Sequence, residues 1–312
     1  NRTMQFEDVT KVLDFLKQID VHSVTLIGGE PTVYPEIFEV IKKARNNGIR
    51  VGMVTNGVKL VNKKFLDELI DSGISSIGVS LKGYDKESFI ETAKCDAFED
   101  VLQGIRNLSD NSVPYSVSFV LTEKNIPFIS KGIDSIVQCG AKSIGLAFCY
   151  NFESCRSNQP GIVNPYLFSQ IFMDNYEEIN TASNGRFSLH QTLPLCVWPI
   201  EFIEKLNERR QIRSICQLLN KNGLIFDTDL SVIPCNAMYD YKFGKYGVDF
   251  EDAITFDKFW NSEKVQQIYD KLRALPDHEC AICERYVNCG GGCVSNWFNY
   301  SFGELKRMKG GE

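Results

Sequence analysis

Four cysteines near the end of the 312-residue chain have a spacing typical of a metal site. They are Cys280, Cys283, Cys289 and Cys293, which form a CxxCxxxxxCxxxC pattern with three glycines between the last two. Cysteine thiolates select zinc or iron–sulfur clusters, and a CxxC turn brings sulfurs together within a short peptide. The tail therefore predicts a metal centre, and both a structural zinc knuckle and a cluster fit the spacing.

A second candidate site follows an apolar, strand-like run at residues 24–27. It consists of Gly28, Gly29, Glu30 and Pro31, ahead of a helix expected from about residue 36. Two glycines let the backbone approach a ligand, a carboxylate can receive an ammonium group, and proline stiffens the turn. Taken alone, the segment could also be an ordinary turn between a strand and a helix.

Together, this loop and the cysteine tail resemble the radical S-adenosylmethionine (SAM) superfamily. Members of that superfamily carry GGEP after the second barrel strand, where it holds the amino group of the SAM methionine moiety. A tail of this kind resembles the SPASM subfamily, whose members bind auxiliary [4Fe-4S] clusters. The resemblance covers essentially the whole chain. It implies an α/β fold in which a partial (β/α)6 radical SAM barrel is followed by a small cysteine-rich SPASM domain.

One motif of the superfamily does not precede the GGEP sequence. The catalytic [4Fe-4S] cluster is bound through CxxxCxxC after the first strand, whereas the first cysteine here is Cys95. Residues 4–9 resemble the start of the first barrel helix, so the first strand and its cluster loop are expected upstream of Asn1. We therefore expect a longer polypeptide, with a relative that lacks this cluster as the alternative.

Apolar strand-like runs alternate with amphipathic helical runs over the first 150 residues, as in parallel βαβ units. Strands are expected at 24–27, 51–55, 74–81, 116–121 and 143–149, with helices near 6–19, 35–47, 63–72, 98–109 and 126–139. With one strand upstream, the count matches the partial barrel, and the ligand is expected at the carboxyl ends of the strands. The expected organisation is a barrel over 1–150, a helical connection over 151–195 and a cluster domain over 196–312.

Polar groups follow two more of these strands. Asn56 lies in a Thr-Asn-Gly segment, and Ser80 and Lys82 lie in a Ser-Leu-Lys-Gly segment. The corresponding family segments line the SAM site. The resemblance therefore implies that Asn56 bonds a ribose hydroxyl and that Ser80 and Lys82 meet the ribose or the carboxylate. A routine turn and a solvated charge are the alternatives.

The SPASM pattern also suggests how the cysteines divide between two auxiliary clusters. In that pattern a cysteine and a hairpin ending in Pro-Cys serve the first cluster, together with the last cysteine of the tail. The resemblance assigns one cluster to Cys196, Cys216, Cys235 and Cys293, and three corners of the other to Cys280, Cys283 and Cys289. Two departures are that Leu230 replaces the usual hairpin glycine and that no cysteine follows Cys293. The second cluster therefore takes a ligand beyond Glu312 or keeps an open iron.

The remaining cysteines divide into one core residue and three candidates for chemistry. Cys139, at a predicted helix end, is expected to pack in the core. Cys95, Cys149 and Cys155 lie near the ligand-bearing side of the expected barrel and are candidate hydrogen-atom donors, as in some peptide epimerases of this superfamily. Filling of the core is the alternative for these three thiols.

Composition excludes several classes of partner. A formal charge of −6 argues against nucleic acid, and no run approaches the ~20 apolar residues of a membrane span. Eleven cysteines without secretory marks indicate a reducing cytoplasm, with metal binding in preference to disulfides.

The resemblance implies radical chemistry, in which a reduced [4Fe-4S] cluster cleaves SAM and a 5′-deoxyadenosyl radical abstracts a hydrogen atom. Because SPASM enzymes mostly act on peptides, we expect a maturase that installs a thioether or carbon–carbon crosslink in a ribosomally made precursor peptide. An electron donor such as flavodoxin or ferredoxin is the expected partner. The alternatives are an anaerobic sulfatase maturase that forms formylglycine, a peptide epimerase, and a non-enzymatic metal-binding scaffold.

Overall fold

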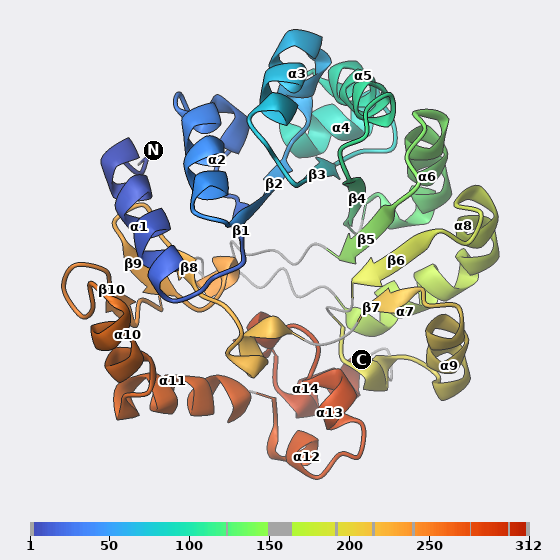
Figure 1. Ribbon diagram of the computed structural model, residues 1–312. Helices are drawn as coiled ribbons and strands as arrows, with labels where there is room; N and C mark the ends of the chain where they lie inside the picture. Colours follow the sequence, from blue (N-terminus) through green and yellow to red (C-terminus); the bar gives the residue numbers. More distant parts are fainter. Residues whose placement is uncertain are drawn as a thin grey trace.

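The computed structural model describes residues 3–122, 124–148, 164–190, 193–213, 216–238, 241–274, 276–298 and 300–309. Its central element is a seven-stranded sheet in which neighbouring strands follow one another in chain order, from β1 to β7. All the pairs in this sheet are parallel. Helices lie outside the curved sheet, and the region after β7 completes the ring (Figure 1).

The first part of the sheet alternates strands with covering helices. Its elements are α1 (Phe6–Gln18), β1 (Ser23–Leu26), α2 (Ile37–Asn46), β2 (Arg50–Thr55), α3 (Lys63–Asp71), β3 (Ser76–Leu81), α4 (Lys86–Ala93), α5 (Phe98–Ser109), β4 (Tyr115–Leu121), α6 (Ile129–Gln138) and β5 (Ile144–Phe148). The five predicted strands and their helices are therefore confirmed, with small shifts at their ends.

The sheet continues past the expected barrel boundary near residue 150. The further elements are α7 (Pro165–Asp174), α8 (Tyr176–Ala182), β6 (Phe187–His190), α9 (Ile200–Glu208) and β7 (Ile212–Arg213). The predicted connection over 151–195 thus contains a barrel strand, and the described sheet has two strands more than the five expected in this chain. The strands β6 and β7 have four and two residues, which is too short to show a periodic pattern in the sequence. They are recognised in the structure because β6 pairs with β5 and β7 pairs with β6. The domain limits remain a prediction.

The two faces of the sheet carry different side chains, because successive residues of a strand point to opposite sides. The outer face carries large apolar residues that pack under the helices, such as Met53, Ile77 and Phe119, each at most 1% exposed. The Phe119 ring lies so close to α6 that a Cβ at Gly132 would stand 2.5 Å from it. Glycine at this position therefore lets α6 approach the sheet.

The inner face of the sheet carries short side chains. These are Gly52, Ser76, Gly78, Ser80, Ser116, Ser118, Gly145 and Ser188, which lie in register across β2 to β6. Neighbouring members come close, since a Cβ at Gly145 would stand 2.9 Å from Ser118 Oγ. Because these residues are small, they take up little room on this face, which also carries Val54, Val120 and His190 nearer the ends of the strands.

The C-terminal region, residues 216–309, consists of short elements that follow β7 and complete the ring. These are β8 (Ile225–Phe226), β9 (Ser231–Ile233), β10 (Gly244–Lys245), α10 (Ala253–Trp260), α11 (Glu263–Ala274), α12 (His278–Ala281), α13 (Tyr286–Cys289) and α14 (Phe302–Lys309). The three strands form an antiparallel sheet in the order β10-β9-β8.

This region packs against both ends of the barrel chain. At one end, the fully buried Phe15 of α1 contacts the rings of Phe226, Tyr246, Phe250 and Phe256, with centroids 5.3–6.3 Å away. At the other end, α14 lies against α7. The aromatic contacts bury large apolar surfaces on both sides and fix the region relative to the barrel.

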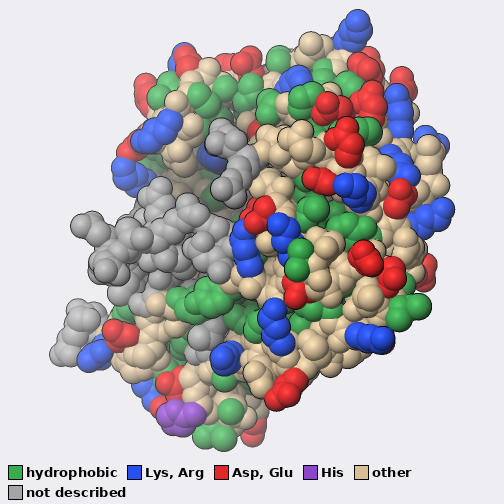
Figure 2. All heavy atoms as spheres, turned by 90° about the vertical axis from the view of Figure 1, so that its left-hand side faces the viewer, with side chains coloured by type: hydrophobic (Ala, Val, Ile, Leu, Met, Phe, Trp, Pro, Cys, Tyr) green, Lys and Arg blue, Asp and Glu red, His purple; other side chains and the backbone are tan. Residues whose placement is uncertain are grey.

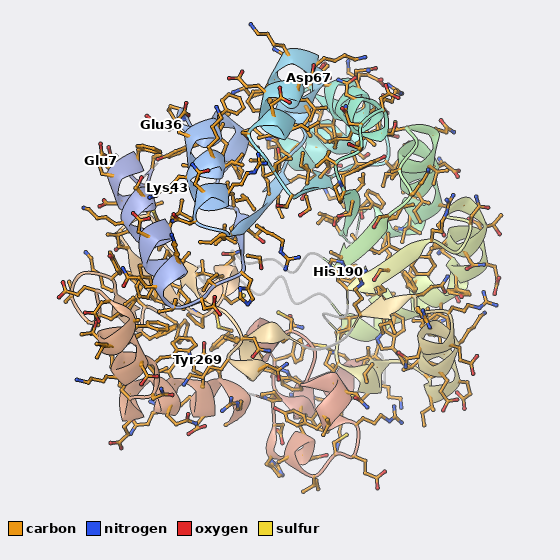
Figure 3. The ribbon with its side chains drawn as sticks, in the orientation of Figure 1. Glu7, Glu36, Lys43, Asp67, His190 and Tyr269 are labelled. Atoms are coloured by element: carbon orange, nitrogen blue, oxygen red, sulfur yellow. The ribbon has the colours of Figure 1, made fainter. Side chains whose placement is uncertain are left out.

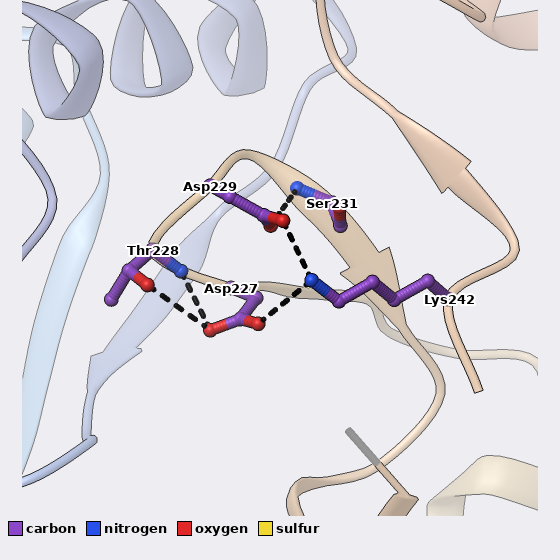
Figure 4. Close-up of polar contacts among 5 residues, drawn as sticks. All are labelled: Asp227, Thr228, Asp229, Ser231 and Lys242. Atoms are coloured by element: carbon purple, nitrogen blue, oxygen red, sulfur yellow. Dashed lines mark hydrogen bonds and ion pairs between the residues drawn. The ribbon is translucent and has the colours of Figure 1, made fainter. Parts of the chain in front are cut away.

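The turn between β8 and β9 is held by charged groups. Lys242 Nζ lies 2.6 Å from Asp229 Oδ2 and 3.4 Å from Asp227 Oδ2, and Asp229 also accepts a hydrogen bond from the Ser231 amide (Figure 4). Lys242, followed by the Ser231 hydrogen bonds, lowers the pKa of Asp229. Leu230 in this turn has φ = 67°, so it adopts the left-handed conformation that glycine takes more readily.

Two surface properties complete the description of the fold. Among the described residues, no helix has the length and apolar character needed to cross a membrane. Figure 2 shows acidic and basic side chains interspersed on the face it presents, so the described atoms of this face carry both signs of charge.

Candidate cofactor loop and cysteine sites

The GGEP loop (Gly28 to Pro31) follows β1 and is tied to the end of β2 by the Glu30 carboxylate. Glu30 Oε1 accepts hydrogen bonds from the Thr32 amide (3.1 Å), Thr32 Oγ1 (2.7 Å) and Thr55 Oγ1 (2.6 Å). Its Oε2 accepts a hydrogen bond from the Asn56 amide at 2.7 Å. A carboxylate offers about four acceptor positions, so these bonds occupy most of its capacity.

The side of the loop that is open to a ligand is the glycine backbone. A Cβ at Gly28 or Gly29 would meet nothing within 4 Å. Gly28 has φ = 141°, which side chains rarely adopt, and Pro31 is buried at the start of the short 3₁₀ helix that follows. The sequence predicted Glu30 as the group that receives an ammonium. In the structure its carboxylate also ties the loop to β2, and its contact with an ammonium group stays a prediction.

Two residues that the sequence analysis missed support this loop. Thr55 links Glu30 to the next turn, because its Oγ1 also accepts a hydrogen bond from the Gly57 amide at 3.1 Å. Lys59 donates to the Thr32 carbonyl at 2.8 Å and lies over the Phe65 ring at 4.3 Å from the centroid. The only local signal was a threonine and a lysine flanking Asn-Gly, which by itself does not specify these contacts.

Asn56 and Gly57 form the turn that was expected after β2. Asn56 Oδ1 accepts a hydrogen bond from the Val58 amide at 3.0 Å, and Gly57 has φ = 82°. A Cβ at Gly57 would stand 2.7 Å from Val79 Cγ1. The turn is therefore confirmed, and contact of the Asn56 side chain with a ribose stays a prediction.

Ser80 and Lys82 lie at the end of the neighbouring strand β3. Ser80 is on the inner face, in register with Ser118, and Lys82 is exposed just beyond the strand. A Cβ at Gly83 would stand 2.4 Å from the Phe89 amide nitrogen, so glycine is needed for α4 to pack there. The predicted SAM-contacting residues thus follow three adjacent parallel strands, whose carboxyl ends share one edge.

His190 places an imidazole on the inner side of β6 (Figure 3). It lies close to the adjacent strand β5, since a Cβ added at Gly145 would stand 3.3 Å from His190 Nε2. Burial, followed by the charge of Arg213, lowers the pKa of His190, so the imidazole is neutral at pH 7.

The tail cysteines lie on two short helices separated by a tight turn. Cys280 is in α12 and Cys289 ends α13, and all three glycines after Cys289 have positive φ, between 55° and 77°. At the middle one, Gly291, a Cβ would stand 2.8 Å from both Pro276 and Trp297. The Gly-Gly-Gly run therefore allows a backbone conformation that would be strained for residues with a side chain.

Cys196 lies beside these tail cysteines, although it is distant from them in the sequence. The Leu195 amide donates a hydrogen bond to Cys289 Sγ at 3.2 Å. Burial, and then the thiols Cys196, Cys289 and Cys283, raises the pKa of Cys280 to about 12. Cys196 keeps part of its surface open, yet burial, followed by Cys289, raises its pKa to about 11.

The predicted grouping of Cys196 with Cys216, Cys235 and Cys293 stays a prediction. Cys196 lies in the short 3₁₀ helix Leu195–Val197, and the flanking Leu195 and Val197 are buried. Of the other members of this predicted group, Cys216 directly precedes the 3₁₀ helix Gln217–Asn220, and Cys235 comes shortly after β9.

The other cysteines are placed as follows. Cys139 is 2% exposed in the core, as predicted, and burial raises the pKa of its thiol. Cys95 is exposed between α4 and α5, and its role as a hydrogen-atom donor stays a prediction. Cys149 and Cys155 lie outside the described residues.

The fold is a parallel α/β barrel with a glycine-rich loop at the end of β1. This is the architecture that the sequence predicted. Residues 1–126 match the family model of the radical SAM superfamily. These residues make up less than half of the chain, and over them the chain is similar to the radical SAM superfamily. This confirms the predicted recognition of the superfamily and supports an enzymatic role.

Curated relatives match about half of the chain. A probable GTP 3′,8-cyclase of Saccharolobus islandicus is 32% identical over 148 residues, which are 47% of this chain and 47% of the relative. The corresponding protein of Sulfurisphaera tokodaii is 32% identical over 142 residues, or 45% of each chain. The chain thus spans about half the length of the curated relatives it matches.

Solved structures with a similar fold extend over nearly the whole chain. The structure of anSMEcpe with bound AdoMet has a TM-score of 0.67 at 19% identity, and the match covers 99% of this chain and 91% of that one. Streptococcus suis SuiB bound to S-adenosylmethionine has a TM-score of 0.67 at 17% identity, covering 92% and 66%. At these identities the similarity is one of fold, and it confirms the predicted partial barrel with an added C-terminal region.

Proposed function

We propose that this chain belongs to a radical SAM oxidoreductase that modifies a peptide, installing a thioether or carbon–carbon crosslink in a ribosomally made precursor. The observation that carries the proposal is fold similarity that continues through the C-terminal region to proteins solved with peptides. SuiB bound to the precursor peptide SuiA matches 92% of this chain with a TM-score of 0.64, and anSMEcpe with the Cp18Cys peptide matches 99% with a TM-score of 0.66.

The GGEP loop fits SAM as its ligand. The backbone of Gly28 and Gly29 borders open space, so an amino acid moiety can approach it closely. Glu30 fixes this backbone against β2, and Ser80 and Lys82 stand at the neighbouring strand end. When bound, SAM and a reduced [4Fe-4S] cluster supply a carbon-centred radical that removes a hydrogen atom from an unactivated carbon.

The barrel interior suits an extended substrate chain. Much of its described inner face is glycine and serine, which are small and offer hydroxyl groups. Main-chain hydrogen bonding to such a substrate would tolerate varied side chains while fixing register.

The cysteines of the C-terminal region fit auxiliary clusters. Cysteine thiolates are the usual ligands of [4Fe-4S] clusters, and the described thiols of Cys196, Cys280 and Cys289 gather in one place. We propose that this region holds auxiliary clusters and that a flavodoxin or ferredoxin supplies electrons to the enzyme.

The test is an anaerobic assay of the full-length protein, reconstituted with iron and sulfide. SAM, a reductant and candidate precursor peptides are added, and 5′-deoxyadenosine and peptide masses are measured by mass spectrometry. The expected result is faster SAM cleavage with the cognate peptide, which loses two mass units. Tandem fragmentation then separates a thioether from a carbon–carbon bond. Absence of 5′-deoxyadenosine under these conditions would contradict the proposal.

Two other substrates are specific alternatives that the same assay separates. The 32% identity to probable GTP 3′,8-cyclases favours a nucleotide, and SAM cleavage stimulated by GTP alone would support it. A peptide cysteine converted to formylglycine would instead indicate a sulfatase maturase, and a changed stereocentre without a mass loss of two units would indicate an epimerase.

A further inference from the structure

We propose that Cys196 is the fourth ligand of the tail site, so that Cys196, Cys280, Cys283 and Cys289 hold one [4Fe-4S] cluster. The inference rests on the proposed function, because it requires an iron–sulfur cluster in the tail. It also replaces two earlier possibilities, a ligand beyond Glu312 and an open iron, with a residue that lies within the described chain.

The backbone around Cys196 is held at the tail. The Leu195 amide donates to Cys289 Sγ at 3.2 Å, and adjacent Cα atoms are only ~3.8 Å apart. Cys196 therefore directly follows a residue whose backbone contacts the sulfur of Cys289. Amide hydrogen bonds to cysteine sulfur are among the features that tune iron–sulfur clusters.

The segment that carries Cys196 is rigid. Leu195 and Val197, on either side, are 6% and 4% exposed. Pro194 and Pro199 bracket the short 3₁₀ helix and restrict its backbone. A movement of this segment away from the tail would expose the apolar side chains of Leu195 and Val197 to solvent. The position of Cys196 beside the tail is therefore favoured before a cluster binds.

The four thiols are near one another. Cys280 interacts with Cys196, Cys289 and Cys283, as well as with Asp277, and Cys196 interacts with Cys289 and Cys283, as well as with Arg285. These four cysteines are not joined by disulfides. Four free thiols in one place match the four cysteine ligands of a [4Fe-4S] cluster, and a coordinating thiol gives up its proton to become such a ligand.

The assignment joins two distant parts of the fold. Cys196 lies between β6 and α9 of the barrel, whereas Cys280 and Cys289 belong to α12 and α13. A cluster held by both would fasten the C-terminal region to the barrel, in addition to the aromatic contacts of α1. Cys216, Cys235 and Cys293 would then remain as the predicted ligands of the other auxiliary cluster.

Double variants can test the grouping directly. The full-length protein is prepared anaerobically as Cys196→Ala, Cys283→Ala, Cys235→Ala and the pairs 196/283 and 196/235. Iron and sulfide content and the Mössbauer and electron paramagnetic resonance spectra are then compared. Cys139→Ala, which removes a buried core thiol, is the matched control.

If Cys196 belongs to the tail cluster, Cys196→Ala and Cys283→Ala alter the same spectral component, and their pair loses no more than the iron of that one cluster. Each single variant loses about four iron ions, or about one if a three-iron cluster remains, and the pair loses at most about four. The pair 196/235 should perturb two spectral components. Perturbation of two components in the pair 196/283, or an unchanged spectrum for Cys196→Ala, would overturn the inference.

Two further readings separate failure of the inference from failure of the proposed function. Circular dichroism and melting temperature show whether each variant is folded, and Cys196→Ser gives a second variant of nearly unchanged size. Stoichiometric zinc in the tail of the unaltered protein would overturn both proposals. Two auxiliary clusters in the unaltered protein with an unaffected Cys196→Ala variant would overturn the inference alone.

Discussion

Replacing Glu30 by glutamine tests whether the carboxylate positions the GGEP loop or contacts the ligand. The carboxylate accepts three hydrogen bonds at Oε1 and one, from the Asn56 amide, at Oε2. Glutamine keeps one oxygen but turns the other into an NH2 donor. With that oxygen facing Thr32 and Thr55, the new NH2 faces the Asn56 amide, and two donors then oppose each other.

The expected cost follows from this geometry. A hydrogen bond to a charged group contributes about 1.5–3 kcal/mol, and Glu30 is only partly buried, so we expect a loss of ~2 kcal/mol in the free energy of unfolding. A loss of ~1.4 kcal/mol in loop positioning would weaken SAM binding about tenfold.

The assay combines urea unfolding with SAM titration by calorimetry. Glu39→Gln makes the same chemical change at an exposed position of α2 and serves as the matched control. Thr55→Val removes one hydroxyl partner of Glu30 while it leaves the carboxylate in place, so it should reproduce part of both effects.

Two results would refute the reasoning. Unchanged stability with strongly weakened SAM binding would show that Glu30 contacts the ligand directly, as the sequence first indicated. Unchanged stability and binding in both Glu30→Gln and Thr55→Val would show that this hydrogen-bonded group does not hold the loop.

Three further changes test other parts of the structure. Gly29→Val should leave the urea midpoint nearly unchanged but abolish most SAM binding, because its side chain would project into open space beside the loop, and a large stability loss would contradict this. Gly57→Ala should destabilise the fold by ~2 kcal/mol or more, since φ is 82° and the new Cβ would stand 2.7 Å from a valine methyl, and a normal melting temperature would argue against it. Asp229→Asn should cost about 1 kcal/mol at pH 7 through its ion pair with Lys242. Because folding lowers the pKa of Asp229, this contribution is present above about pH 4 and is lost as the pH falls further. The variant and the unaltered protein should therefore differ less in free energy of unfolding at pH 2 than at pH 4, as measured by denaturation curves. A difference that stays constant over this range would contradict the assignment.

Much of the fold could be predicted from the sequence because its signals are local. The strands β1 to β5 and their helices have patterns of apolar residues that repeat within a few positions, and the GGEP loop is a contiguous segment. The spacing of the tail cysteines is a local signal too, and the metal site that it indicates stays a prediction. In each of these cases a short stretch of chain carries the chemical requirement within itself.

The parts that only the tertiary structure decided depend on contacts between distant residues. Leu230 occupies the left-handed position predicted for a hairpin glycine, but the sequence could not show that the turn keeps this backbone without glycine. The strands β6 and β7 are too short to carry a pattern and are defined by the neighbours they pair with.

The candidate sites show the same division. The sequence indicated a ligand-binding role for Glu30, which stays a prediction, but it could not show that the fold brings Thr55 and the Asn56 amide to the carboxylate. The sequence likewise could not show that the Leu195 amide, next to Cys196, donates a hydrogen bond to Cys289 Sγ. Spacing along the chain determines which groups one segment can present together, and only the packing of segments far apart in the sequence determines which of those groups finally meet.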